Sequence, residues 1–576
     1  MGITSSLITG LSGLSSNQSK LDVVGNNIAN VNTVGFKAST IDFKTQLAQT
    51  YSVGSSPNGD LGGTNPIQVG MGVVSGAVSR NFNDGSREVT CVTSNLALEG
   101  DGFFILNNNG AQCYSRDGSF VLNSLNQLVN SDGLLVQGFG IDSNYNVVPG
   151  VLQDVSIPLG ALTVADATTK ATMTGNLNTD GPVPSQVSDL TLNQPFYTSD
   201  GTGGVTGTAP TSTTLLTAQT NASGQSYFQT GDTLTLSGQI GSRSANAKTL
   251  AVGAGTSLGD LMSFMNGTLG INTSAGVNGN VATTPGVALA AGASGSAVLT
   301  IDGNIGAEND LTLTPSCFSI TNATGTTTPF SWAKNTAANG ESITTSTTIY
   351  DSLGTAVKLN VTACLVSRSA TGATWRFFAS SPDGTATNAL TQTAIGTGTL
   401  TFDTAGRLVN STGTTVNIDR TGTGATPNLN FNLDFSEISG LADTSSSLAT
   451  TLVDGSPKGT LTSYSIDKSG IVSGTFSNGL SRTLGQVALA TFRNNQGLVD
   501  KGNNTWQEGP NSGTAVISTA GQFTAGKIIS GALELSNVDL SAEFVQLISA
   551  STGFSASSRV ITTSNQLLQE LLSAAR

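Results

Sequence analysis

The stretch LSAEFVQLISASTGFSASSRVITTSNQLLQELL, residues 540–572, places a large apolar side chain at every seventh position. That position is held by Leu540, Leu547, Phe554, Ile561 and Leu568, and Phe544, Ile548 and Leu572 lie beside it. A seven-residue apolar period on a helix forms a strip that packs against a second helix. Asp539 is the predicted N-cap, with Glu543 in the first turns. At 1.5 Å per residue, this helix would be roughly 50 Å long.

The other end of the chain shows the same period. Apolar residues recur every seven positions at Leu7, Leu14, Leu21 and Ile28, with Val24 and Val31 in the second heptad position and Leu11 beside them. Since only the two ends carry such segments, we expect the terminal helices to pair; the alternative is that each packs separately on a globular body. Their opposite faces carry Ser, Thr, Asn and Gln, which could line a water-filled channel or contact neighbouring copies.

Between the ends, the sequence pattern is almost entirely that of β-strands. Leu429, Phe431, Leu433 and Phe435 alternate strictly with polar residues, and turns are predicted at 302–303, 467–470 and 478–479. One short internal helix is expected from residue 258, closed by Gly267. Residues 200–225 and 268–297 are rich in Thr, Gly, Ala and Ser, which predicts loops or a loosely constrained outer domain.

The composition favours a surface that contacts copies of itself. Only 10% of the 576 residues are charged, against about 25% in an ordinary globular domain, and Gly alone numbers 70. Uncharged polar residues must therefore cover the surface, and such a face does not repel an identical neighbour. The net charge of −13 argues against a nucleic-acid-binding protein, which needs a basic surface.

Motifs for catalysis or for metal and cofactor binding are missing from the sequence. Histidine is absent, which removes the commonest general base and metal ligand. No phosphate-binding loop, zinc spacing, EF-hand or nucleophile elbow occurs. We therefore expect no catalytic residue, no metal and no cofactor, and an enzyme is the least expected class.

The four cysteines, Cys91, Cys113, Cys317 and Cys364, fit no zinc or Cys-x-x-Cys spacing. We expect each to be a buried or half-buried thiol in preference to half of a disulfide. Cys364 lies in the alternating run Lys358–Leu365, on the face opposite its apolar neighbours.

The N-terminus lacks the basic start and apolar stretch of a cleaved signal peptide. No segment approaches the ~18 apolar residues of a membrane helix. By themselves, these features predict a soluble and cytoplasmic protein without membrane insertion.

Several long motifs resemble those of the bacterial flagellar rod and hook proteins. The first is NNIANVNTVGFK at residues 26–37, in which the family signature falls on Asn26, Asn27, Ala29, Asn30, Gly35 and Phe36. The others are LEGDGFF at 98–104, YSRDGSF at 114–120, SGALELSNVDL at 530–540 and VITT at 560–563. MTGNLN at 173–178, IYDSLG at 349–354 and GQVALATF at 485–492 resemble landmarks of the hook. The sequence departs from the family at 551–556, where Phe554 keeps an aromatic side chain but its neighbours are smaller.

This resemblance implies a mainly β, multi-domain protein whose N- and C-terminal helices pair as an inner, coiled-coil-like domain. The expected divisions are an inner helical domain at 1–32 and 537–576, an extended hinge segment at 33–90, one β-rich domain at 91–178 and 456–536, a second at 179–200 and 341–455, and an inserted outer domain at 201–340. The polymerisation strip is expected at Leu7, Leu14, Leu21, Val24, Ile28, Val31, Leu540, Phe544, Leu547, Phe554, Ile561 and Leu568.

The implied function is a structural subunit of the flagellar hook, a curved hollow tube that transmits torque from rod to filament. Its expected partners are other copies of itself, the distal rod protein, the hook cap protein, the hook–filament junction proteins and the flagellar type III export apparatus. That route would place the protein outside the cell without a cleaved signal peptide, and it replaces the cytoplasmic prediction. The alternatives are a distal rod or hook–filament junction protein and, from another class, a secreted β-rich adhesin. Whether Cys317 or Cys364 forms a cross-link between subunits, as in some hooks, stays open.

Overall fold

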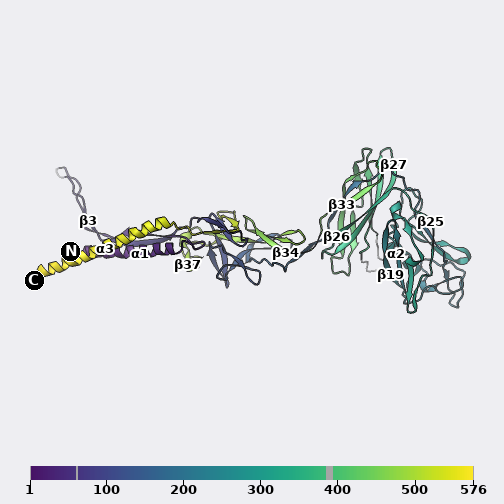
Figure 1. Ribbon diagram of the computed structural model, residues 1–576, viewed down its shortest axis with the longest axis horizontal. Coiled ribbons are helices and arrows are strands. Elements are labelled where there is room, and N and C mark those ends of the chain that lie inside the picture. The colour runs from purple at the N-terminus through teal and green to yellow at the C-terminus, as the bar shows by residue number, and fades with distance from the viewer. Residues whose placement is uncertain (1, 60–61, 275, 385–393, 575–576) are drawn as a thin grey trace. The chain divides into compact units, whose positions relative to one another are not determined.

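The computed structural model describes residues 2–59, 62–274, 276–384 and 394–574 of the chain (Figure 1). The chain forms two compact units. The first combines Met1–Thr163 with Thr460–Arg576, and the second is the intervening Val164–Gly459. Both units are built mainly from β-strands, so the predicted β character of the chain between its ends is confirmed.

The two longest helices belong to the first unit and pack against each other. They are α1 (Gly2–Ala29) and α3 (Leu540–Ala574), which lie side by side in Figure 1. The predicted pairing of the chain ends is therefore confirmed. Asp539 caps α3 as expected, since its Oδ1 accepts the backbone N–H groups of Ser541 at 2.9 Å and Ala542 at 3.2 Å.

The β-rich part of the first unit is a large, mostly antiparallel sheet drawn from both halves of the chain. Along its main path run β34 (Ser456–Ile466), β35 (Ile471–Phe476), β36 (Ser481–Thr491), β11 (Leu135–Ile141), β7 (Phe103–Asn108), β8 (Ala111–Ser115), β38 (Thr505–Gln507) and β37 (Val499–Gly502). At its side, β12 (Val147–Asp154) pairs with β11, β39 (Val516–Thr519) pairs with β36, and the short β9 (Val121–Leu122) and β10 (Leu128–Val129) extend β11. The turns predicted at 467–470 and 478–479 join β34, β35 and β36. Phe103, Tyr114 and Trp506 lie in the core.

Between α1 and this sheet, the chain forms two hairpins. The two are nested: β1 (Ser39–Thr45) pairs with β4 (Val73–Arg80), and between them in the chain β2 (Ala48–Ser52) pairs with β3 (Ile67–Gly70), so together they form one long, interrupted hairpin. Every residue of β2 and β3 is exposed. The returning C-terminal chain pairs with the N-terminal chain, because β40 (Lys527–Ser530) joins β6 (Leu96–Glu99) and β41 (Ala532–Glu534) joins β5 (Arg87–Val89).

The described residues of the second unit form two large hydrophobic cores and a smaller cluster of Val187, Val277, Ile305, Cys364 and Phe378. Two sheets enclose the first core. One consists of β31 (Thr415–Asp419), β32 (Asn428–Ser439), β14 (Lys170–Asn176) and β33 (Ser447–Val453). The other consists of β26 (Ser342–Tyr350), β27 (Ala356–Ser369), β28 (Gly372–Ser380), β29 (Ala394–Phe402) and β30 (Leu408–Ser411). Strand β32 buries the alternating apolar residues that predicted it, Leu429, Phe431, Leu433 and Phe435.

The other core gathers two further sheets and the internal helix. The first sheet consists of β20 (Gly286–Ala291), β21 (Ala297–Asp302), β15 (Asp189–Leu192) and β25 (Trp332–Thr336). The second consists of β19 (Arg243–Ala251), β18 (Thr233–Ile240), β22 (Leu311–Thr312), β23 (Phe318–Asn322) and β24 (Gly325–Thr327). The helix α2 (Leu258–Thr268) confirms the predicted internal helix, but Gly267 lies in its last turn and Leu269 is the C-cap. Residues 286–291, predicted as part of a loop, form β20, because small residues such as Ala pair in a strand when a neighbouring strand supplies the hydrogen bonds.

One cysteine agrees with the expectation and one differs from it. Cys364 lies on β27 and is fully buried, on the face opposite Val361 and Leu365, where Val187 and Ile305 cover it. The Cys364 thiol donates a hydrogen bond to the carbonyl oxygen of Ile305 at 3.2 Å. Cys91 is exposed, where a buried or half-buried thiol was expected; it follows β5, and its backbone N–H donates to the Gly531 carbonyl oxygen while its side chain lies at the surface.

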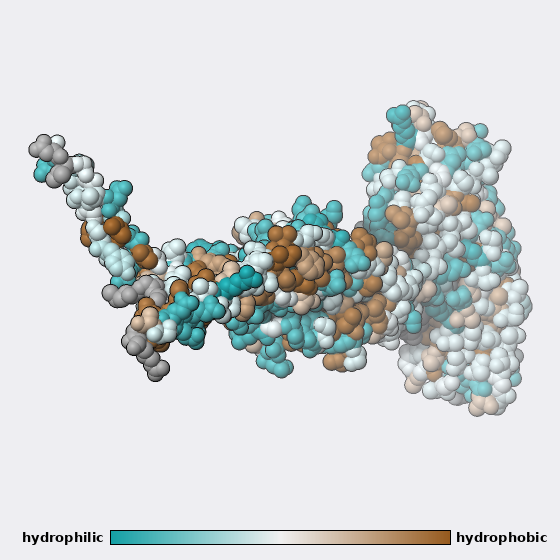
Figure 2. Space-filling view, turned by 60° about the vertical axis from the view of Figure 1, so that its left-hand side comes forward, coloured by the Kyte–Doolittle hydropathy of each residue, from teal (hydrophilic) through white to brown (hydrophobic). Residues whose placement is uncertain are grey.

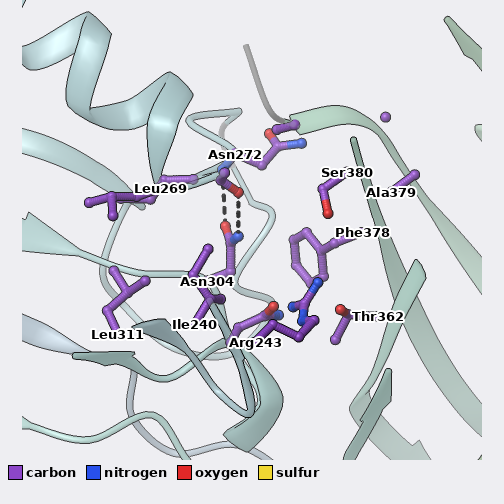
Figure 3. A pocket seen from close by; sticks show the side chains of 15 residues that line it. Ile240, Arg243, Leu269, Asn272, Asn304, Leu311, Thr362, Phe378, Ala379 and Ser380 are labelled. Carbon is purple, nitrogen blue, oxygen red and sulfur yellow. Dashed lines mark hydrogen bonds between the residues drawn. The ribbon is translucent and has the colours of Figure 1, made fainter. Parts of the chain in front are cut away.

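A narrow cavity separates the two cores of the second unit (Figure 3). Arg243, Asn304 and Phe378 point into it, and the Asn304 amide is held on both sides: its oxygen accepts the Asn272 N–H at 3.0 Å and its nitrogen donates to the Gly270 carbonyl oxygen at 3.0 Å. The free volume is about 30 Å³, which is room for about one water molecule and not for a substrate.

Candidate assembly surface on the paired helices

The contact line between α1 and α3 is made of small residues. A Cβ atom built on Gly13 would lie 2.9 Å from Ser557 Oγ, and one built on Gly553 would lie 2.8 Å from Asn17 Oδ1. At Gly10, the corresponding distance to Ile561 Cγ1 is 3.1 Å. The helices therefore approach more closely than larger side chains on this line would permit.

Polar contacts at both ends of this line set the direction of the pair. Ser6 Oγ lies 3.1 Å from Ser564 Oγ, and Asn27 Nδ2 donates to Glu543 Oε1 at 3.1 Å. The early part of α1 thus meets the late part of α3, and the helices are antiparallel. The sequence interpretation missed these contacts, although the close spacing of Gly10 and Gly13 in one helix was a signal of close helix approach.

Most of the predicted strip residues flank this line, and Ile561 meets it at Gly10. Val24 alone is fully buried, at 2% exposure. The half-buried members are Leu7, Leu14, Leu21, Ile28, Val31, Leu547, Phe554, Ile561 and Leu568. Leu540 and Phe544 are exposed at 39% and 51%. The buried side chains of α3 are Glu543, Ala550 and Ser564, which repeat at multiples of seven residues. Two of these three are small, so this heptad position, and not the one that carries the large apolar residues, faces α1.

Large apolar side chains remain exposed on the outer faces of the paired helices. Near the start of α3 these are Leu540, Phe544, Val545 and Ile548, and further along the pair they are Ile8, Leu11, Val560, Leu567, Leu571 and Leu572. A soluble monomer rarely exposes so many large apolar residues on neighbouring turns. Burial of this surface requires contact with another molecule. We call these residues the outer apolar faces.

The signature motif of residues 26–37 forms the joint between the helices and the β-rich part. Asn27 is fully buried; its amide nitrogen donates to the Ser39 carbonyl oxygen at 2.8 Å, and its amide oxygen accepts the Ser39 N–H at 2.9 Å. Asn30 closes the end of α1 by donating to the Asn26 carbonyl oxygen at 2.9 Å. Asn26 and Ala29 are themselves exposed.

Gly35 and Phe36 are also buried in this joint. Gly35 has a φ of 70°, and a Cβ atom there would lie 2.7 Å from the Asp117 backbone nitrogen, so the position requires glycine on two counts. Its N–H donates to the Glu534 carbonyl oxygen at 2.8 Å, which ties the N-terminal segment to β41.

A buried cluster of charges completes the joint. Lys37 Nζ lies 2.6 Å from Glu534 Oε1, and both side chains are fully buried. Arg116 Nη1 lies 3.4 Å from Glu534 Oε2 and 3.4 Å from Asp84 Oδ1. Two cations and two carboxylates therefore balance. Burial lowers the pKa of Lys37, and the neighbouring Glu534 carboxylate opposes that change.

These features are packing, hydrogen-bonding and ion-pair contacts. Among the described residues, no cluster of three or more Cys, Asp or Glu side chains could hold a metal ion. The described helices also include none with the length and apolar content needed to cross a membrane. The site offers packing surfaces, a tight helix contact and a buried joint.

Comparison with known proteins identifies three matching family segments. Residues 7–37 match the flagella basal body rod protein family, residues 97–182 the flagellar hook protein FlgE/F/G D1 domain, and residues 529–574 the flagellar basal body rod FlgEFG protein C-terminal family. All of α3, α1 from residue 7 onward, and Lys37, Arg116 and Glu534 of the joint fall inside these segments.

Individual relatives extend this similarity over the full chain. The flagellar hook protein FlgE of Treponema pallidum is 28% identical, with 99% of each chain covered. The flagellar basal-body rod protein FlgG of Bacillus subtilis is 38% identical over 31% of this chain and 69% of its own length. The crystal structure of Helicobacter pylori flagellar hook protein FlgE2 aligns with 78% of this chain at 19% identity and a TM-score of 0.36.

Proposed function

Because this chain belongs to the flagellar rod and hook protein family, we propose that it is the subunit of a flagellar hook and polymerises into a curved hollow tube that transmits torque from rod to filament. The observation that carries the assembly step is the pair of outer apolar faces on α1 and α3, which a single copy leaves uncovered. Similarity over nearly the whole length of hook proteins favours the hook over the rod, because the rod relative matches only 31% of this chain.

We assign the wall of the tube to the paired helices. The strip residues Leu547, Phe554 and Ile561 are half-buried in one copy, so a neighbouring copy would complete their burial. The outer apolar faces would then contact the helices of adjacent copies, and the uncharged polar residues of α1, such as Ser15 and Gln18, would face water inside the tube.

The second unit suits a flexible outer layer. Its visible surface in Figure 2 is mostly of intermediate hydropathy, with few strongly hydrophobic patches. Faces of Ser, Thr and Gly slide past one another with smaller energy differences than interlocked ion pairs would allow. A tube with a continuous inner wall and such outer units would bend easily while resisting twist.

The proposed location follows from this role. The subunit would leave the cell through the flagellar type III export apparatus, without a cleaved signal peptide, and would assemble outside the membrane. Its neighbours would be the distal rod protein below, and the hook cap and hook–filament junction proteins at the growing end. The protein would have a structural role and no catalytic activity.

Deletion of the gene followed by electron microscopy of isolated basal bodies tests this function. We expect rods without hooks, and we expect the purified chain to form curved tubes. Straight, rigid polymers would instead support a distal rod protein. A stable monomer that binds glycans and tolerates removal of both terminal helices would support an adhesin, and it would refute the hook.

A further inference from the structure

An apolar groove lies on the β-rich part of the first unit, built from elements other than the paired helices. It encloses about 330 Å³ and is lined by Phe139, Pro149, Leu152, Ile517 and Phe523 among others. None of its lining residues is charged. The groove therefore has no group that would pair with a charged ligand, and its polar lining residues are Ser518, Thr519 and Gln522.

The rim of the groove exposes an aromatic side chain. Phe523 is 89% exposed and has a φ of 53°, a backbone conformation that is unfavourable for an aromatic residue. A strained backbone that holds a phenyl ring in water, next to an open apolar groove, indicates a surface for protein contact.

The same unit carries a rigid apolar projection. Leu125 is 72% exposed at the tip of the turn between β9 and β10. Asn123 Oδ1 accepts the N–H groups of both Leu125 and Gln127 at 2.9 Å, and the Asn123 carbonyl oxygen accepts the Asn126 N–H at 2.9 Å. This turn therefore presents the Leu125 side chain with little conformational freedom left to lose on binding.

The projection and the groove lie at different points along one stretch of extended chain. The Ile157 N–H donates to the Asn126 carbonyl oxygen at 2.7 Å, which anchors the tip beyond the end of β12, whereas Leu152 within β12 lines the groove. At about 3.3 Å per residue, the five residues from Leu152 to Ile157 span roughly 17 Å. Because the projection and the groove are different surfaces at different places on the chain, a contact between them can repeat from one copy to the next. Such a head-to-tail row of copies keeps a free projection at one end and a free groove at the other.

We propose that Leu125 of one copy inserts into the groove of the next copy, making a head-to-tail contact between the β-rich parts of neighbouring subunits. This inference rests on the proposed polymeric function. A second copy is the occupant because the proposed polymer brings copies of this chain into contact, and charged residues are absent both from the groove lining and from the turn Asn123–Gln127 that carries Leu125.

Cysteine cross-linking of the full-length chain tests the contact. In a Cys91→Ser, Cys317→Ser background, the double variant Leu125→Cys, Ile517→Cys is oxidised with copper phenanthroline. We expect a ladder of disulfide-linked trimers and longer species. Each single variant alone should give no ladder, and an equimolar mixture of the two should give dimers only. Dimers formed as readily by Leu125→Cys alone, or a double variant that stays monomeric, would overturn the proposal.

Assembly kinetics supply a second measurement. Leu125→Asp should slow tube growth by about tenfold or more, because a charge replaces a buried leucine, while Leu441→Asp, at an exposed leucine of the second unit, should not. Tubes that form at the wild-type rate with Leu125→Asp would refute this contact and leave the hook function intact. A wild-type chain that never forms tubes would refute the hook function, and the cross-linking result would still decide the contact.

Discussion

Lys37 Nζ and Glu534 Oε1 lie 2.6 Å apart in a fully buried ion pair, although 497 residues separate the two in the chain. Glu534 belongs to β41, and Lys37 is the last residue of the signature motif, beyond the end of α1 at Ala29. Arg116, from the β-rich part, shares the same carboxylate. The two ends of the chain and the β-rich part are therefore joined at one point. A buried pair of this kind is costly to break, because the remaining partner is left charged and without a counterion.

Replacing Glu534 by Gln should strongly destabilise the first unit. The change leaves Lys37 and Arg116 with Asp84 as the remaining carboxylate of the cluster, and loss of one partner of a buried pair costs about 3–5 kcal/mol. The loss of stability can be measured as the free energy of unfolding in urea, with hydrogen exchange of the β41 and β5 amides as the local readout. The control is Arg87→Gln, which breaks the partly exposed pair with Glu99 and should cost no more than about 1 kcal/mol. Equal losses in both variants would contradict a special role for the joint.

Gly13→Val should separate the terminal helices, whereas Gly25→Val should not. A Cβ on Gly13 would already meet Ser557 Oγ at 2.9 Å, but a Cβ on Gly25 would have no atom outside its own helical turn within 4 Å. Both substitutions place the same side chain in the interior of α1, so their intrinsic helix propensities match. Amide protection of α3, measured by hydrogen exchange, should fall in Gly13→Val alone. Similar protection in the two variants would exclude the tight contact line.

The double variant Leu547→Asp, Phe554→Asp should abolish tube assembly while both β-rich units stay folded. Two carboxylates on the strip would oppose burial between copies, and neither residue belongs to a core of the β-sheets. Electron microscopy scores the tubes, and near-UV circular dichroism reports the packing of Trp375 and Trp506. Ser551→Asp, on an exposed position of the same helix, is the matched control. Normal tubes from the double variant would refute the assignment of the strip.

The second unit should lose stability in acid as Asp434 is protonated. The hydrogen bond from Lys170, at 2.7 Å, holds the pKa of Asp434 at about 2, against an ordinary value of 3.8. Because the folded-state pKa is the lower one, the pair stabilises the fold fully above about pH 4, and this contribution disappears as the pH falls towards 2. The thermal midpoint of Asp434→Asn should therefore depend less on pH between 4 and 2 than that of the wild type. Lys170→Met should flatten the curve similarly, and an unchanged slope in both would be the contrary result.

Thiol labelling of the native chain should separate the cysteines by burial. Cys91 is exposed and should react at once, while Cys113 and Cys364 are buried and should react only after unfolding. Burial also raises the pKa of the Cys364 thiol well above its ordinary value, which suppresses the reactive thiolate. Cys91→Ser should remove the fast phase. Rapid labelling of Cys364 in the native protein would show that the two cores of the second unit open in solution.

Sequence periodicity determined the elements of this protein that depend on local pattern. The seven-residue repeat marked both terminal helices and their partnership, Asp539 marked the start of α3, and the alternation from Leu429 to Phe435 marked β32. Each of these signals depends on residues close together in the chain, where the helical or strand period directly decides which side chains share a face.

Tertiary structure alone decided which residues meet across those elements. The heptad positions predicted a large apolar contact, but Gly10, Gly13 and Gly553 form the line along which the helices touch. The pairing of Lys37 with Glu534, and the covering of Cys364 by Ile305, join residues far apart in sequence. Local patterns carry no information on such pairs, because close packing selects partners by shape and charge only after the chain has folded.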